Sequence, residues 1–154
     1  MSGAAGLRRR FTRVFSSLNR LFYEVSGGTL GGKLRGAPVL LLTTTGRKTG
    51  KRRTTPLLFL ADTNDYILVA SNGGSPTHPS WFLNLEANPD VEVHVKRDRK
   101  PMRARVATPA ERERLWPRLV TMYPPYEQYQ ARTSREIPVV ILERATSSQR
   151  RPAG

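Results

Sequence analysis

The residues best suited to binding chemistry lie in one short basic segment, residues 46–53, which reads GRKTGKRR and contains no acid. Guanidinium and ammonium groups make charge-assisted hydrogen bonds to phosphates and carboxylates. Gly46 and Gly50 allow the backbone to turn tightly and bring N–H groups close to a ligand. We therefore predict a clamp for an anionic ligand, with a solvated hairpin tip as the alternative. Its cations are Arg47, Lys48, Lys51, Arg52 and Arg53.

The rest of the sequence carries few groups for acid–base or nucleophilic catalysis. It has no cysteine and only two histidines, His78 and His94, which excludes disulfides and argues against a metal centre. No nucleophile–base pair and no paired carboxylates are visible, and Gly46 and Gly50 are too close together for a nucleotide phosphate-binding loop. An enzyme with this equipment would take its chemistry from a cofactor, for which the protein supplies binding and orientation.

The net charge of the chain is +14, from 26 basic and 12 acidic residues. Such a balance favours an anionic partner, either nucleic acid, anionic lipid, or a phosphorylated or carboxylated ligand. A nucleic-acid-binding module would interleave aromatic residues with its basic patches. Residues 46–53 and 96–105 contain no aromatic residue, so we do not expect a nucleic-acid partner and keep that module as the alternative.

Two apolar runs flank the basic segment, and both are typical of buried strands. In all, the patterns predict strands over residues 39–45, 57–60, 66–70, 91–95, 102–106 and 137–142. Pro79 suits the first position of a short helix, and Thr108 with Glu111 forms a capping box that begins another, in which Pro117 should kink the chain or start a new segment. We predict an α+β protein, a small barrel of about six strands with helices packed outside it.

The two ends of the chain differ from this central domain, which we place at residues 37–144. Residues 7–25 predict a basic amphipathic helix, followed by a glycine-rich connector to residue 36. The helix would pack on the core or lie on an anionic membrane surface. Residues 145–154 predict a disordered tail. No stretch approaches the roughly 20 apolar residues of a membrane span, so we expect a cytoplasmic protein. If the amphipathic helix lies on a membrane, the protein would be peripheral on the inner face of the cell membrane.

Several motifs in a fixed order resemble the deazaflavin-dependent nitroreductase family of mycobacteria and other actinobacteria. They are LLTTTGRKTG at 41–50, ASNGG at 70–74, PSWFLNLEANP at 79–89, YPPYEQYQART at 123–133 and IPVV at 137–140. The resemblance extends from about Pro38 to Glu143. It implies a split β-barrel, the deazaflavin coenzyme F-420, and hydride transfer from the reduced coenzyme to a quinone such as menaquinone or to a nitroaromatic acceptor. A split barrel that uses flavin mononucleotide is the remaining alternative.

The resemblance also assigns roles to individual residues. Arg47, Lys48 and Arg53 match positions that bind the anionic tail of the coenzyme. The positions around its ring and linker are matched by Pro56, Leu57, Ala70, Ser71, Trp81 and Asn84. The acceptor site is matched by Leu58, Ser71, Tyr123, Tyr126 and Tyr129, of which Ser71, Tyr126 and Tyr129 are the catalytic candidates. The tyrosine spacing of three also places these rings along one face of a helical turn.

Two positions depart from the family pattern. The family's best-known member has tyrosine where this chain has Leu58, and lysine where it has Asn72. Both lie near the expected site, so the resemblance predicts an altered acceptor preference, above all toward nitroimidazoles.

Overall fold

The computed structural model describes residues 33–34 and 36–145. The predicted amphipathic helix at 7–25 and the predicted tail beyond Ala145 lie outside these residues, whereas Ala145 itself is buried. Within the described part, no helix has both the length and the apolar character needed to cross a membrane.

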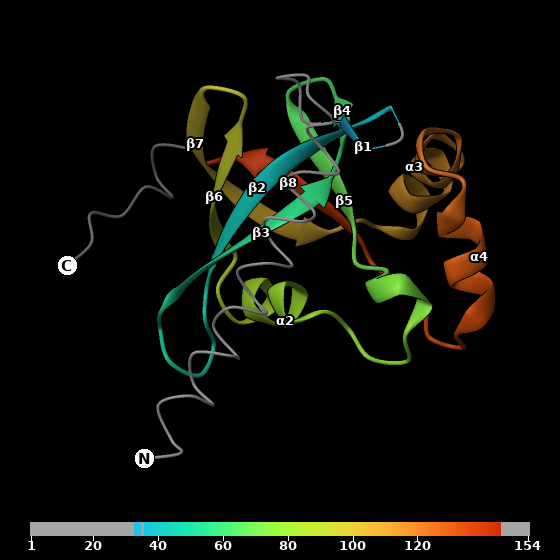
Figure 1. Ribbon diagram of the computed structural model, residues 1–154, viewed down its shortest axis with the longest axis horizontal. Coiled ribbons are helices and arrows are strands. Elements are labelled where there is room, and N and C mark those ends of the chain that lie inside the picture. Colours follow the sequence, from blue (N-terminus) through green and yellow to red (C-terminus); the bar gives the residue numbers. More distant parts are fainter. Residues whose placement is uncertain (1–32, 35, 146–154) are drawn as a thin grey trace, which may run out of the picture.

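Eight antiparallel strands, three α-helices and one short 3-10 helix make up the described chain, so the predicted α+β class is confirmed (Figure 1). The strands are β1 (Lys33–Leu34), β2 (Ala37–Thr45), β3 (Arg52–Leu58), β4 (Leu60–Asp62), β5 (Asp65–Val69), β6 (Asp90–Val95), β7 (Asp98–Val106) and β8 (Val139–Arg144). The helices are η1 (Asn72–Gly74), α2 (Ser80–Ala87), α3 (Pro109–Met122) and α4 (Pro125–Arg132).

The sheet is organised around β2, which pairs with β3 on one side and with β6 on the other. From β6 the ladder continues through β7, β8 and β5 to β4. The short strand β1 pairs with the start of β2. The edge strands β3 and β4 are consecutive in sequence and are separated only by Phe59. The apolar run predicted as one strand at 57–60 is therefore divided, because Leu57 and Leu58 pair with β2 while Leu60 pairs with β5. This division and the two-residue β1 account for the two strands beyond the predicted six.

The sheet separates two hydrophobic cores. The inner core lies inside the curved sheet and under α2, and it contains Leu40, Leu42, Trp81 and Val93. The outer core lies between the sheet and the helices α3 and α4, which pack together beside it (Figure 1). Strands β5 and β8 contribute to both cores through alternate residues, as a strand with two buried faces must.

Helix α3 runs through Pro117 as one helix rather than breaking there. Proline cannot donate to the carbonyl four residues earlier, which belongs to Glu113. Glu113 and Pro117 are both exposed, so water can take the place of the missing donor. The buried residues of α3, Leu115 and Leu119, lie on the face toward the outer core.

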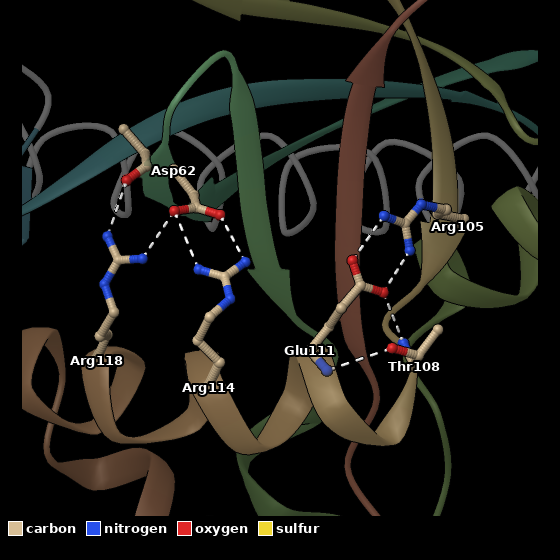
Figure 2. Close-up of polar contacts among 7 residues, drawn as sticks. Asp62, Arg105, Thr108, Glu111, Arg114 and Arg118 are labelled. Atoms are coloured by element: carbon tan, nitrogen blue, oxygen red, sulfur yellow. Dashed lines mark hydrogen bonds and ion pairs between the residues drawn. The ribbon is translucent and has the colours of Figure 1, made fainter.

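Ion pairs fasten α3 to the sheet at its N-terminal end (Figure 2). The predicted capping box is present, because Thr108 and Glu111 exchange side-chain-to-backbone hydrogen bonds. The same carboxylate accepts a bidentate pair from Arg105 of β7, at 2.6 and 2.7 Å, and Arg105 also donates to Glu143 of β8 at 2.6 Å. The hydrogen bonds that Glu111 accepts, first from Arg105 and then from the Thr108 backbone, lower its pKa to about 2.

Further along the helix, α3 is fastened to the β4–β5 hairpin. Arg114 donates to Asp62 at 3.0 Å and Arg118 donates to the same carboxylate at 2.8 Å (Figure 2). These two hydrogen bonds lower the pKa of Asp62. Two arginines on successive turns of α3 therefore bind one acid of the hairpin. They lie on the exposed side of α3, whereas its buried residues contact the outer core.

Replacement of Glu111 by glutamine should lower the free energy of unfolding at neutral pH by roughly 1–2 kcal/mol, since this partly exposed carboxylate contributes less than a fully buried one. A carboxyl group whose pKa is depressed on folding stabilises the protein fully above its ordinary pKa, 4.5, and loses that contribution as the pH falls toward about 2. The deficit of the variant should therefore shrink over that range in urea unfolding. The exposed neighbour Glu113→Gln is the control, and an equal deficit in both variants would contradict the assignment.

Candidate active site

The predicted anion clamp is the tight loop between β2 and β3. The Gly46 N–H donates to the Lys51 carbonyl at 2.7 Å, and the Gly50 N–H donates to the Gly46 carbonyl at 2.8 Å. Gly50 adopts a φ of +71°, which favours glycine. At Gly46 a Cβ atom would lie 3.0 Å from the Lys51 carbonyl oxygen. The loop is closed by its own backbone, and its five cationic residues are exposed.

A buried amide fastens this loop to the rest of the molecule. The Asn84 Oδ1 atom, on α2, accepts from the backbone N–H of Arg47 at 3.1 Å and from its guanidinium at 2.9 Å. The Asn84 Nδ2 atom donates to Thr44 Oγ1 of β2 at 3.3 Å. Asn84 is 4% exposed and Thr44 is 1% exposed. Asn84, predicted to contact the coenzyme, thus makes the contacts that set the direction of the loop.

The charges of the loop suit an anionic ligand. The side chains of Lys48 and Arg53 are exposed, and within residues 36–145 neither pairs with an acid. Arg47 uses only part of its donor capacity on Asn84. Arg52 differs, because it pairs with Glu92 at 3.2 Å. The three predicted cations Arg47, Lys48 and Arg53 thus belong to one exposed loop and its adjoining strand, where they can make charge-assisted hydrogen bonds to an anion.

The residues predicted around the coenzyme ring lie mostly beneath the surface. Ala70 and Trp81 belong to the inner core, and Leu57 packs against it from β3. Pro56 is buried on the same strand, whereas Ser71 is half-buried. These side chains support the end of the sheet that carries the clamp, α2 and η1, which lie along the lower edge of Figure 1.

The three predicted tyrosines form one aromatic cluster where α3 passes into α4. The ring centroids are 4.9 Å apart for Tyr123 and Tyr126, and 6.4 Å apart for both other pairs. Tyr126 is 5% exposed and belongs to the outer core, and burial raises the pKa of its hydroxyl. Tyr123 and Tyr129 are half-buried, and Leu58 packs against the same core. Tyr126 thus supports two tyrosines that reach the surface.

Two features of the site are not evident from the sequence. Gly74 of η1 lies so close to α4 that a Cβ atom there would be 2.7 Å from the Tyr129 carbonyl oxygen. The guanidinium of Arg135 contacts the loop that contains Ser71. Gly74 lies in the ASNGG motif, but the motif does not reveal its contact with α4, and a single arginine between α4 and β8 does not stand out in so basic a chain.

Replacement of Asn84 by alanine should lower the free energy of unfolding by about 1–3 kcal/mol, because it leaves the buried Thr44 hydroxyl without its partner. It should also speed amide exchange at Arg47, whose N–H loses its acceptor. Urea unfolding and hydrogen exchange measure the two effects. Gln128→Ala, which removes an exposed amide from α4, is the control and should change neither. Unchanged exchange at Arg47 in Asn84→Ala would contradict the anchoring role.

Sequence and structure comparisons agree on the relatives of this chain. A protein of Mycobacterium tuberculosis named F420H(2)-dependent quinone reductase is 44% identical over 132 residues, which cover 82% of this chain and 88% of the relative. A second, named a putative F420H(2)-dependent quinone reductase and also from Mycobacterium tuberculosis, is 47% identical over 105 residues, 68% of this chain and 88% of the relative.

Solved structures give the same picture. An F420-H2 dependent reductase superposes with a TM-score of 0.64 at 47% identity, over 69% of this chain and 94% of that one. HutZ, described as the heme storage protein of Vibrio cholerae, shares the fold alone, with a TM-score of 0.53 at 13% identity over 71% of this chain and 82% of its own. The family description "F420H(2)-dependent quinone reductase" matches residues 16–144, and the chain therefore belongs to that family.

Proposed function

We propose that this protein transfers hydride from reduced coenzyme F-420 to a menaquinone-like quinone, with nitroaromatic compounds as further acceptors. The observation that carries the proposal is the cationic loop 46–53, which a buried amide holds at one end of the sheet. When bound, the reduced coenzyme supplies the hydride, and the protein supplies binding and orientation.

The clamp would bind the anionic tail of the coenzyme. Arg47, Lys48 and Arg53 donate charge-assisted hydrogen bonds to its phosphate and carboxylates. The ring and linker would lie toward η1 and α2, beside Pro56, Leu57, Ala70, Ser71, Trp81 and Asn84. We propose the split barrel as the framework. It is supported by the connection of the edge strands β3 and β4, which belong to different edges of the sheet but are joined in sequence by Phe59 alone.

The acceptor would lie against the tyrosine cluster. Tyr123 and Tyr129 present half-buried rings on which a flat quinone can stack, and Tyr126 and Leu58 support them from the outer core. Hydride transfer requires the reacting atoms to be held about 3–3.5 Å apart. The hydroxyl of Ser71 is the polar group proposed to donate a hydrogen bond to the oxygen on which negative charge develops.

An absorbance titration tests the cofactor assignment. Purified protein is mixed with coenzyme F-420 or with flavin mononucleotide, and binding is followed in the visible spectrum. The proposal predicts preferential binding of the deazaflavin and, with the reduced coenzyme, oxidation that depends on added menadione. Preferential binding of flavin mononucleotide would support the alternative split-barrel oxidoreductase. Binding of neither, together with salt-dependent binding of single-stranded DNA, would support the nucleic-acid module.

The clamp can be tested by Lys48→Glu. Loss of one charge-assisted bond corresponds to roughly 1.5–3 kcal/mol, so affinity for the full coenzyme should fall at least about 10-fold. Affinity for a deazaflavin without the tail should change less. Arg97→Glu makes the same change of charge in the exposed turn between β6 and β7 and is the control. Equal affinity of wild type and Lys48→Glu for the full coenzyme would refute the clamp.

The effects of replacing the tyrosines should depend on how deeply each ring is buried. Tyr126→Ala should lower the free energy of unfolding by about 3–5 kcal/mol, as expected for a buried aromatic ring. Tyr129→Ala should destabilise the protein less and should raise the Michaelis constant for menadione or lower turnover. Tyr66→Ala, which truncates a half-buried tyrosine packed on the inner core, is the control for kinetics. Unchanged menadione kinetics in Tyr129→Ala would remove this ring from the acceptor site.

A further inference from the structure

Arg135 gathers acceptors from four residues of the loop that follows β5. Its Nε atom donates to the Ser75 carbonyl at 2.8 Å, and one terminal nitrogen donates to the Ser71 carbonyl at 2.8 Å. The other terminal nitrogen lies 3.3 Å from the Ala70 carbonyl oxygen and 3.1 Å from His78 Nδ1. One planar side chain therefore holds both ends and the middle of a loop that spans residues 70–78.

The chemistry of these contacts requires an arginine. A guanidinium only donates, so His78 Nδ1 is the acceptor in this contact. Within the described residues no carboxylate pairs with Arg135, and burial lowers the pKa of its guanidinium. Its charge is stabilised chiefly by carbonyl dipoles. A lysine has a single donor nitrogen and could not reach acceptors spread over this distance.

A second contact fixes the same loop against α4. Gly74 has a φ of +80°, and a Cβ atom there would lie 2.7 Å from the Tyr129 carbonyl oxygen and 3.0 Å from its Cα atom. No other residue type fits without moving one of the two backbones. The loop that begins with Ser71 is thus seated directly on the turn of helix that carries Tyr129.

We propose that Arg135 is a positioning residue, which sets the distance between Ser71 and Tyr129 and thereby the placement of the acceptor over the hydride donor. The inference rests on the proposed function, because Ser71 and Tyr129 are its acceptor-side residues. Arg135 acts through the backbone of the 70–78 loop. The cationic clamp at 46–53 has a separate anchor, the amide of Asn84. Tail binding and acceptor placement should therefore respond to different substitutions.

Arg112 provides a matched control. It also lies partly buried, and it donates to the Ile137 carbonyl in the segment between α4 and β8 and to Gln130 Oε1 of α4 at 3.2 Å. It pairs with Glu136 at 2.9 Å and makes no contact with residues 70–78 within the described chain. Arg112→Lys should therefore cost stability in the same region without moving Ser71.

The experiment compares Arg135→Lys and Arg135→Gln with Arg112→Lys and wild type. Menadione turnover divided by its Michaelis constant should fall between about 10- and 100-fold in the Arg135 variants, as expected for a misplaced reacting group. The ratio of affinities for the full and tail-less deazaflavins should stay within about twofold of the wild-type ratio. A change of about twofold is no larger than the error with which the effects of independent substitutions add. Lys48→Glu should show the reverse pattern.

A ligand-free measurement accompanies the kinetics. The N–H groups of Gly74 and Ser75 donate to the Ser71 and Asn72 carbonyls at 2.9 and 3.1 Å. Their hydrogen exchange should become faster in the Arg135 variants and remain unchanged in Arg112→Lys. Gly74→Ala is a second variant that disturbs the same loop without removing a charge, and it should give the same kinetic pattern as Arg135→Lys.

The outcomes separate this inference from the function on which it rests. Wild-type protein that oxidises the reduced coenzyme, together with Arg135 variants that match Arg112→Lys in kinetics and in exchange at Gly74 and Ser75, would overturn the positioning role alone. Wild-type protein that neither binds coenzyme F-420 nor reduces menadione would overturn both. If Arg135→Gln is recovered unfolded, Arg135→Lys and Gly74→Ala decide the question.

Discussion

The candidate site depends on one pair of strands, β5 and β8, whose two faces are both buried. Leu68 and Val140 point into the inner core, whereas Ile67 and Ile141 point into the outer core under α3 and α4. Strands buried on both faces cannot shift register without exposing apolar side chains to water. The pair therefore joins the two cores, and it fixes the position of the loop that leaves β5 and of the segment that enters β8.

The ends of this pair meet at the site because the strands are antiparallel. Val69 lies opposite Val139, and the Ala70 N–H donates to the Pro138 carbonyl at 3.0 Å. The loop that leaves β5 thus begins beside the segment that enters β8. Arg135 reaches that loop from this segment, which explains how one side chain contacts residues about sixty positions away in sequence.

Two kinds of polar anchor serve the two halves of the site. On the clamp side a neutral amide, Asn84, is buried with its partners satisfied and orients a loop whose cations remain exposed. On the acceptor side the anchor is itself a cation, Arg135, held by carbonyl oxygens. Elsewhere α3 is held by acid–arginine pairs such as Arg105 with Glu111. Within the described residues, the loop cations Arg47, Lys48 and Arg53 pair with no acid, so they stay available to an anionic ligand.

The sequence by itself determined the elements whose signals are local. Apolar alternation predicted most strands, the capping box predicted the start of α3, and the spacing of three grouped Tyr123, Tyr126 and Tyr129. The basic loop was equally evident, because glycine and charge composition are read within a few residues.

Only the tertiary structure decided which polar groups meet across the fold. Asn84 and Arg47 are 37 positions apart, and Arg135 and Ala70 are 65 apart. The division of one apolar run at Phe59, and the burial of Tyr126 below its two neighbours, likewise follow from partners that are distant in sequence. Such contacts are set by strand pairing and by packing in three dimensions, to which neither local spacing nor composition is sensitive.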